Sequence, residues 1–180
     1  MIRARFATYE DLIAVPENMV AELIDGELYA SPRPPGPHIR ARSALGGLIG
    51  PPFDFGKGGP GGWWILFQPE LHFGRDVLVP DLAGWRKERM PQIPTGHFYV
   101  VPDWVCEVIS PSSERLDRLK KMPIYAREGV PFAWFVDPLQ QLLSARKLQE
   151  GEWILREYGA DKLRVEPFEA IEIEMSHVWA

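Results

Sequence analysis

The chain has 180 residues, a formal net charge of −5 and a single cysteine, Cys106. One cysteine excludes an intramolecular disulfide and the usual thiolate zinc sites, and the acidic balance argues against a protein that coats nucleic acid over its whole surface. No run approaches the roughly 18 apolar residues of a membrane span, and the N-terminus has no apolar signal core. We therefore expect a single domain over residues 1–180, in the cytoplasm and without membrane contact.

The first predicted elements are a short helical turn and a hairpin. The segment from Thr8 can start a helical turn, which Pro16 limits. Two alternating runs then flank Asp25-Gly26, a strong hairpin signal because both residues accept positive φ. The hairpin carries Glu22 and Glu27, for which solvated strand charges are an equally good interpretation.

A helix is predicted from His38 to Ile49, after a proline-rich loop from Arg33 to Pro37. Its predicted core residues are Ile39, Ala41, Leu45, Leu48 and Ile49. His38 and Arg42 lie one turn apart. A histidine at a helix start is more often a cap or a surface residue than a catalyst, so that alternative stays open. The glycine- and proline-rich segment 50–62 lacks the spacing of a phosphate-binding loop and is predicted to be a connector.

The middle of the chain is predicted to contain an antiparallel hairpin and a buried strand. The hairpin pairs Trp63–Phe73 with Asp76–Trp85, and a proline-containing loop follows over residues 87–102. Trp104–Ile109 is apolar on both alternating faces, which is typical of a strand buried between two layers. Glu107 interrupts this run, and a buried carboxylate is costly unless a partner or a metal compensates it.

A helix with a parallel return strand is predicted next. The segment Ser110–Ser113 supplies capping residues, Gly129 ends the helix, and Pro123 is expected to kink or restart it. Phe132–Val136 is a second buried strand, so the strand, helix and strand form a βαβ-like crossover. Strands over 142–148 and 152–158, joined by a turn, and a short apolar tail complete the chain.

Carboxylates from these strands are candidates for metal binding. Asp81 and Glu107 would converge at one end of a sheet if their strands are neighbours, and Mg²⁺ prefers such oxygen ligands. Asp117, Lys121 and Tyr125 share one helix face by their spacing. A metal with a lysine can activate water for phosphoester hydrolysis. The alternative is a structural Asp81, a surface ion pair from Asp117 to Lys121, and a core Glu107 satisfied by backbone donors.

Several short motifs resemble those of the large bacterial Uma-two family, which is placed in the PD-(D/E)XK, or restriction-endonuclease-like, nuclease superfamily. The resemblance runs from about Tyr9 to Phe168. The matching segments are A-E-L-I-D-G-E-L with Glu22, P-G-P-H with His38, V-P-D-L with Asp81, W-V-C-E-V-I-S-P-S with Glu107, D-x-x-x-K-x-x-x-Y with Asp117, Lys121 and Tyr125, and G-V-P-x-x-W-x-V-D-P ending at Pro138. Each segment alone is a weak signal, but their order along the chain is fairly specific.

The resemblance implies a mixed α/β, restriction-endonuclease-like fold, with a central mixed sheet flanked by helices and an N-terminal hairpin. It implies Asp81 and Glu107 as metal ligands and Glu22 as a further acidic residue. A main-chain carbonyl of Val108 or Ile109 could be another ligand. Ile109 occupies the position where the superfamily usually has its lysine, so the implied catalytic lysine is Lys121 on the following helix. Phe132-Ala133 departs from the polar residue and tyrosine that are common there.

These residues together predict an endonuclease that cleaves nucleic acid, expected to be DNA. Its expected cofactor is Mg²⁺, for which Mn²⁺ can substitute. The catalytic residues are Glu22, Asp81, Glu107 and Lys121, the supporting residues are His38, Asp117 and Tyr125, and candidates for phosphate contacts are Arg115, Arg118 and Lys120. A solvated helix face is the simpler interpretation of each of the three basic residues. A homodimer is compatible with this kind of fold. The alternative function is a non-catalytic nucleic-acid- or protein-binding module on the same scaffold.

Overall fold

A six-stranded mixed sheet forms the centre of the computed structural model, which describes residues 6–32, 34–110 and 113–179. Its strands run in the order β10-β9-β8-β7-β6-β3. They are β3 (Trp63–Phe67), β6 (Leu82–Arg86), β7 (Trp104–Val108), β8 (Phe132–Asp137), β9 (Leu142–Gln149) and β10 (Glu152–Tyr158). The β7 and β8 strands pair in parallel and the other neighbours pair antiparallel, so the predicted crossover and mixed sheet are confirmed.

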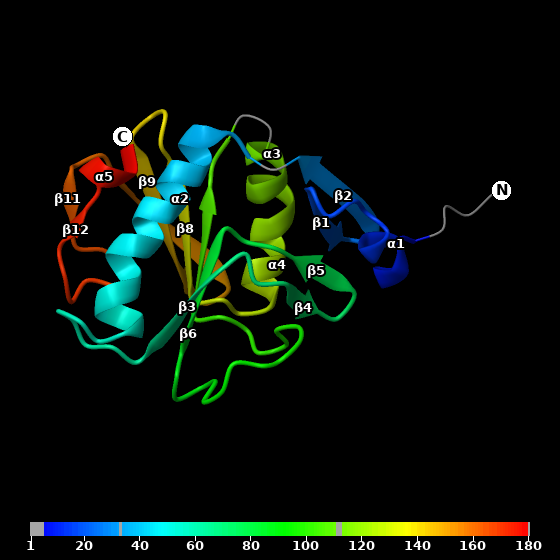
Figure 1. Ribbon diagram of the computed structural model, residues 1–180, viewed down its shortest axis with the longest axis horizontal. Coiled ribbons are helices and arrows are strands. Elements are labelled where there is room, and N and C mark those ends of the chain that lie inside the picture. Colours follow the sequence, from blue (N-terminus) through cyan, green and yellow to red (C-terminus); the bar gives the residue numbers. More distant parts are fainter. Residues whose placement is uncertain (1–5, 33, 111–112, 180) are drawn as a thin grey trace.

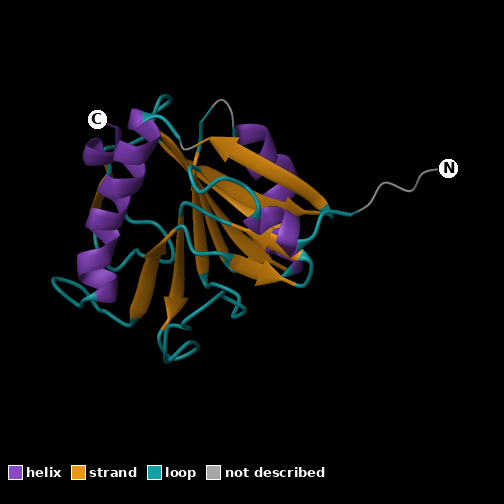
Figure 2. Ribbon diagram, turned by 45° about the vertical axis from the view of Figure 1, so that its right-hand side comes forward, coloured by secondary structure: helices purple, strands orange, loops and turns teal. Residues whose placement is uncertain are grey.

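Helices cover both faces of this sheet (Figure 1). One face carries α2 (Gly36–Ile49) and α5 (Ser176–Trp179), and the other carries a continuous helical segment of α3 (Glu114–Leu116), η2 (Asp117–Lys121) and α4 (Met122–Arg127). Figure 2 shows the strands lying between these two groups of helices. The predicted α/β fold with helices flanking a central sheet is therefore confirmed.

The β7 strand is buried on both sides, as its sequence predicted. Trp104, Cys106 and Val108 belong to the core beneath α2, whereas Val105 belongs to the core beneath α4. Alternate residues of a strand point to opposite faces. Glu107 therefore points to the same side as Val105, towards η2 and α4.

A second, four-stranded sheet in the order β2-β1-β5-β4 lies beside the first. Its strands are β1 (Met19–Ile24), β2 (Glu27–Pro32), β4 (Leu71–Phe73) and β5 (Asp76–Leu78). The N-terminal hairpin is confirmed, and its turn residues Asp25 and Gly26 have φ angles of 53° and 79°. A short α1 (Tyr9–Ile13), capped by the side chain of Thr8, precedes it.

The prediction that 63–73 and 76–85 form one continuous hairpin is wrong, because each segment is divided into two strands. Its outer parts, β3 and β6, pair in the central sheet, and its inner parts, β4 and β5, pair in the second sheet. Pro69 and Pro80 lie in the two interruptions, where each lacks the N–H that a ladder requires. Gln68 has a φ of 47°, which also breaks an extended strand. Asp81 thus lies where the chain passes from one sheet to the other.

The α2 helix begins at Gly36, with Pro37 in its first turn as expected. Its buried face contains Ala41, Leu45 and Ile49, but Ile39 is 42% exposed and the prediction that it belongs to the core is wrong. Residues three, four and seven positions apart share a helix face, and this rule places His38, not Ile39, on the side of Ala41 and Leu45. The following segment is not wholly a connector, because it begins with a π-helical turn, η1 (Gly50–Asp54).

Pro123 restarts the helical segment after β7, one of the two outcomes that the sequence predicted. It lies in the first turn of α4, directly after the π-helical η2, where the N–H of Met122 bonds to the carbonyl of Asp117. A wider turn before a proline accommodates a residue that has no N–H to donate. Gly129, with a φ of 78°, follows the helix as predicted. Pro111 and Ser112 of the predicted cap, and Arg33 of the earlier loop, lie outside the described residues. Ser113 precedes α3 but makes no side-chain cap bond.

The predicted apolar tail forms more structure than its sequence indicated. It contains a small antiparallel pair, β11 (Lys162–Leu163) with β12 (Ile173–Glu174), followed by α5. Phe168 lies between these strands in the chain and is fully buried in the core beneath α2. Within the described residues, no helix is long and apolar enough to cross a membrane.

Replacing Phe168 with Ala is expected to destabilise the fold by about 3–5 kcal/mol, the usual cost of removing a buried aromatic side chain. The ring of Phe168 lies 4.6 Å from that of Phe53, 4.9 Å from that of Trp104 and 5.5 Å from that of Trp134, measured between centroids. Urea denaturation followed by tryptophan fluorescence measures the change. Phe55→Ala is the matched control, because Phe55 is 68% exposed and its loss should change stability by less than about 0.5 kcal/mol.

Candidate active site

The start of β6 and the end of β7 bring Asp81 and Glu107 to one place. Leu82 pairs with Cys106 in the antiparallel ladder of these strands, and the same register continued by one residue sets Asp81 opposite Glu107. Opposed residues of antiparallel strands point their side chains to the same face of the sheet. Both carboxylates are buried, and both line the same pocket of about 70 Å³.

Lys121 lies at the centre of a cluster of acidic side chains in this pocket. Its Nζ is 2.8 Å from Oε1 of Glu107, 2.9 Å from Oε1 of Glu22 and 3.5 Å from Oδ1 of Asp117. It also donates to the carbonyl of Val79 at 3.4 Å. Because the side chain of Lys121 is only 2% exposed, its contact with Asp117 is not the surface ion pair of the alternative interpretation.

Among the described residues, side chains rather than backbone donors hold Glu107. The hydroxyl of Tyr125 donates to its Oε1 at 2.7 Å, on the same oxygen that Lys121 contacts. Tyr125 comes one turn after Lys121, so the two groups approach Glu107 from one helix face across Pro123. Glu22 belongs to β1, and its Oε1 accepts a hydrogen bond from the N–H of Val79 at 2.7 Å.

Asp81 has a separate set of partners. Its Oδ1 lies 2.8 Å from Nε2 of His38 and 3.4 Å from Nη1 of Arg42, and its Oδ2 accepts the N–H of Val108 at 2.8 Å. His38 is buried, so the alternative of a cap or surface residue does not hold, and its Nδ1 has no hydrogen-bond partner among the described residues. The buried face of α2 is thus connected with the acidic cluster through Asp81.

Burial and excess negative charge raise the proton affinity of this cluster. Burial raises the pKa of Glu107 well above its usual range; the Lys121 charge lowers it, and the neighbouring carboxylates raise it. Burial likewise raises the pKa of Asp117 and, with the charge of Glu107, that of Tyr125. For Lys121, burial acts to lower the pKa, but the charges of Glu107, Glu22 and other groups hold it well above its ordinary value. The site therefore holds its protons tightly and attracts positive charge.

We call this site the acidic pocket, defined by Glu22, Asp81, Glu107 and Asp117 with Lys121 and His38. All of these residues line one pocket, and they come from β1, α2, the start of β6, β7 and η2. Carboxylate oxygens are the ligands that hard divalent cations prefer. The buried carboxylates, in excess over neighbouring cations, therefore offer oxygen ligands of the kind that such cations prefer.

The predicted basic residues lie outside this pocket. Arg115 is exposed, Arg118 pairs with Glu114 at 2.9 Å, and Lys120 lies 3.9 Å from Asp25. These contacts are those of an ordinary solvated helix face, and they do not by themselves identify a phosphate site.

Arg146, on β9, is a basic residue that the sequence did not single out. The guanidinium groups of Arg146 and Arg118 lie 4.5 Å and 5.1 Å from the ring centre of Phe135, the residue that pairs with Glu107 across β7 and β8. Burial and the nearby charge of Arg118 lower the pKa of Arg146 to about 10. Two guanidinium groups therefore stack on one ring beside the strand of Glu107, and one of them, Arg118, is also paired with Glu114. The available signal in the sequence was that Arg146 alternates with the apolar Ala145 along a predicted strand. That signal did not indicate which residues Arg146 would contact, because this depends on the order of the strands in the sheet.

A family model, Uma2, described as "Putative restriction endonuclease", matches residues 6–176. The chain is also similar to the crystal structure of a "putative nuclease belonging to DUF820" from Anabaena variabilis ATCC 29413. That match has a TM-score of 0.72 at 20% identity and covers 96% of this chain and 97% of the other. It shows the likeness of the two folds. Among curated proteins, none matches this chain.

Proposed function

Because this chain belongs to the Uma2 family, whose description is "Putative restriction endonuclease", we propose that it hydrolyses phosphodiester bonds of nucleic acid, with DNA as the expected substrate. The observation that carries the proposal is the burial of Asp81 and Glu107 in one pocket with Lys121. Burying two carboxylates and an ammonium group has a large energetic cost. Clusters of buried titratable groups are common at catalytic sites, where the chemistry requires them.

The buried carboxylates of the acidic pocket are suitable oxygen ligands for a hard divalent cation. Asp81 and Glu107 would hold Mg²⁺, or Mn²⁺ in its place, with the main-chain carbonyl of Val108 or Ile109 as a further oxygen ligand. The raised pKa of Glu107 supports this assignment, because a cation can replace the positive charge that the proton supplies. Such an ion would polarise the scissile phosphate and lower the pKa of an attacking water.

Lys121 is the group that meets developing charge on the phosphate. Its ammonium lies 2.8 Å from Glu107, so an oxyanion beside Glu107 would be within reach of a buried positive charge. Glu22 is a positioning residue in this proposal, because it holds the lysine and the N–H of Val79 with the same oxygen. Tyr125 orients Glu107, Asp117 contacts Lys121, and His38 fixes Asp81 from the opposite side.

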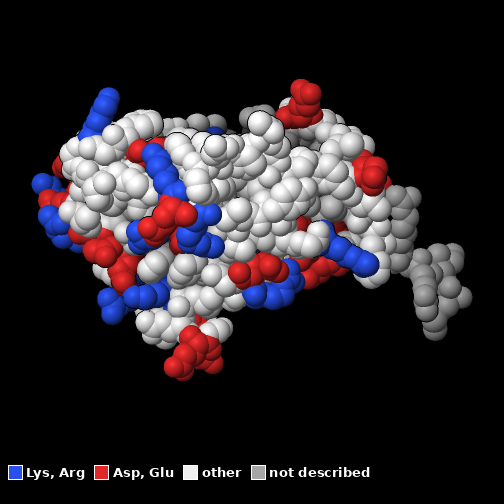
Figure 3. Space-filling model, turned by 90° about the horizontal axis from the view of Figure 1, so that it is seen from below, with Lys and Arg blue, Asp and Glu red and all other residues white. Residues whose placement is uncertain are grey.

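Nucleic-acid binding would be local rather than spread over the surface. On the face shown in Figure 3, basic and acidic side chains are interspersed. The net charge of −5 likewise gives no general attraction to a polyanion. We assign phosphate contacts to Arg118 and Arg146, which are stacked on Phe135, with Arg115 and Lys120 as outer contacts.

The test is cleavage by the purified protein of supercoiled plasmid, single-stranded DNA and RNA, each with Mg²⁺, with Mn²⁺ and with EDTA. We expect nicked or linear plasmid in the presence of either metal and intact plasmid in EDTA. Cleavage of RNA alone would replace DNA as the substrate and leave the reaction class unchanged. No cleavage of any of the three nucleic acids with either metal would overturn the proposal.

One observation favours the alternative of a non-catalytic binding module. Lys121 already contacts three carboxylates and a carbonyl, so these carboxylates have a cationic partner without a ligand. Calorimetric titration with Mn²⁺ separates the two functions. Binding that is lost in Asp81→Asn supports the nuclease, whereas no binding and an unchanged melting temperature support the module.

A further inference from the structure

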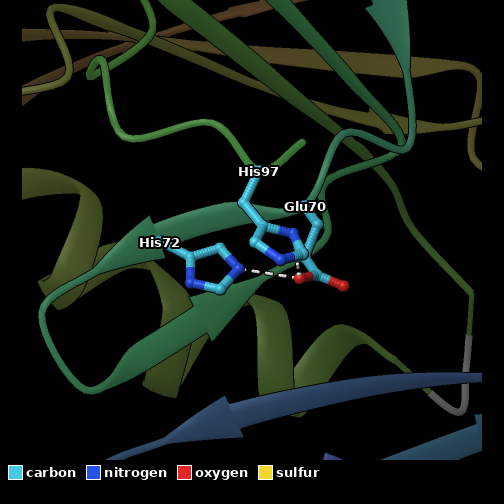
Figure 4. A group of neighbouring side chains, drawn as sticks. All are labelled: Glu70, His72 and His97. Carbon is cyan, nitrogen blue, oxygen red and sulfur yellow. Dashed lines mark hydrogen bonds and ion pairs between the residues drawn. The ribbon is translucent and has the colours of Figure 1, made fainter. Parts of the chain in front are cut away.

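A second group of potential metal ligands lies on β4 and the loop beside it. Glu70 directly precedes β4, His72 is within it, and His97 comes from the loop that follows β6 (Figure 4). Two backbone hydrogen bonds hold the loop on the strand. The N–H of His72 donates to the main-chain carbonyl of Phe98 at 2.9 Å, and the N–H of Phe98 donates to the main-chain carbonyl of Glu70 at 3.1 Å. The relative positions of these residues are therefore fixed by main-chain pairing.

Their side chains converge on one carboxylate oxygen. Oε1 of Glu70 lies 2.7 Å from Nε2 of His72 and 3.0 Å from Nδ1 of His97, and the hydroxyl of Tyr9 donates to the same oxygen at 2.9 Å. Both imidazoles point their nitrogens at Glu70 in Figure 4, with ring centres 4.3 Å apart. One carboxylate oxygen has about two lone-pair sites, so three donors exceed what it can accept well.

We propose that Glu70, His72 and His97 bind a borderline divalent cation of the Zn²⁺ class. Two imidazoles with one carboxylate form a recurring zinc donor set that leaves a fourth position open. Tetrahedral Zn²⁺ with bonds of about 2.0–2.1 Å needs ligand atoms roughly 3.3 Å apart. Because the three ligand atoms lie within 4.8 Å of one another, with the two contacts to Glu70 at 2.7 and 3.0 Å, small side-chain rotations would admit the ion.

Access and outer contacts fit the same assignment. The side chain of His72 is 12% exposed, whereas those of His97 and Glu70 are 39% and 29% exposed, so solvent can reach the cluster from one side. Tyr9 contacts both Glu70 and, at 3.3 Å, Nε2 of His97, and a hydroxyl in that place orients the ligands.

The site is chemically distinct from the acidic pocket. None of its three ligands lines that pocket, and its imidazole nitrogens select Zn²⁺ and similar ions over Mg²⁺. Through Tyr9, His72 and His97, a bound ion would connect α1, β4 and the loop after β6. Its expected effect is thus to fix this edge of the second sheet, independently of any nuclease activity.

The test is titration of the EDTA-treated full-length protein with Zn²⁺ alone, by calorimetry and by thermal unfolding, with Co²⁺ absorption as a spectroscopic reporter of imidazole ligation. We expect one equivalent to bind with imidazole ligation and the melting temperature to rise. His97→Gln, on the loop, and Glu70→Gln should each weaken binding by at least about tenfold, since loss of outer contacts alone costs that much at metal sites. Far-UV circular dichroism of each variant establishes that it is folded.

Two further variants locate the ion. His177→Gln, which removes an exposed histidine in α5, should bind Zn²⁺ like the wild type, and Asp81→Asn should keep the Co²⁺ absorption that reports imidazole ligation. Absence of Zn²⁺ binding in the wild type would overturn the proposal, as would equal affinity in folded His97→Gln and Glu70→Gln. Binding that is lost in Asp81→Asn but kept in His97→Gln would place the ion in the acidic pocket and overturn it too.

Discussion

Asp81→Asn and Glu107→Gln are each expected to reduce metal-dependent cleavage of nucleic acid by at least about 10²-fold, because loss of even an outer contact at a metal site costs 10- to 100-fold. Both substitutions keep the size and shape of the side chain and remove its negative charge. Asp81 keeps an oxygen for the N–H of Val108, and Glu107 keeps an oxygen for the hydroxyl of Tyr125. Lost activity would therefore reflect lost charge at the pocket rather than a lost side chain.

Plasmid nicking at a fixed Mn²⁺ concentration measures the effect, and calorimetry with Mn²⁺ measures binding in the same variants. Glu152→Gln is the matched control, since it removes an exposed carboxylate on β10 and should leave both readouts unchanged. Circular dichroism and a melting curve show whether each variant is folded. Cleavage by folded Asp81→Asn and Glu107→Gln at the wild-type rate would contradict the assignment of both ligands.

Local patterns in the sequence predicted much of the fold. Asp25-Gly26 has the positive φ values that its hairpin signal required, and β7 is buried on both faces, as its continuous apolar run indicated. The segment between β7 and β8 forms the predicted crossover despite Pro123. These features depend on residues close together in the chain, so periodicity and turn chemistry were sufficient to find them.

Features that depend on strand order and register were harder to predict. Helix position alone left a cap or surface role open for His38, because its partner Asp81 is 43 residues away in the chain. The split of one long hairpin between two sheets followed from Pro69 and Pro80, whose effect the alternating pattern concealed. Ile39 was placed in the core because it is apolar, although the helix turns it towards solvent.

The acidic pocket was only partly predictable, because some of its residues carry a local signal and others are brought in by strand order. Glu107 was conspicuous as a charge in an apolar strand, and that single anomaly indicated where to look. Glu22 had no such local signal, because a charged residue on a hairpin is ordinary; the family resemblance named it, and the fold sets it 2.9 Å from Lys121. His72 and His97 were not singled out, since 25 residues separate them in the sequence and loop pairing brings them together.

Lys121→Met is expected to destabilise the protein by about 3–5 kcal/mol at neutral pH, because it removes one partner of a buried ion pair and leaves the other charges uncompensated. Methionine has nearly the length of the lysine stem, so little packing is lost. Glu107, Glu22 and Asp117 all contact the ammonium within 3.5 Å. Lys120→Met is the matched control: its side chain is 42% exposed and its nearest ion-pair partner, Asp25, lies 3.9 Å away, so stability should change by less than about 0.5 kcal/mol.

The deficit of Lys121→Met should shrink as the pH falls. The Lys121 charge lowers the pKa values of Glu107 and Asp117, so its removal raises them further above their values in the unfolded chain. A raised folded pKa contributes stability below the unfolded pKa, and this contribution is lost as the pH rises through the folded pKa. Urea denaturation between pH 5 and pH 8 should therefore show the variant approaching the wild type at the acidic end.

A second substitution separates the charge effect from packing. Glu107→Gln introduced into Lys121→Met removes a buried carboxylate that has lost its partner, so the double variant should be more stable at neutral pH than Lys121→Met alone. Cleavage should remain at least about 10²-fold below the wild type in both, because neither has the buried ammonium that meets phosphate charge. A deficit in Lys121→Met that is independent of pH, and equal in the double variant, would show that the lysine stabilises the fold by packing. The acidic pocket would then not be organised around its charge.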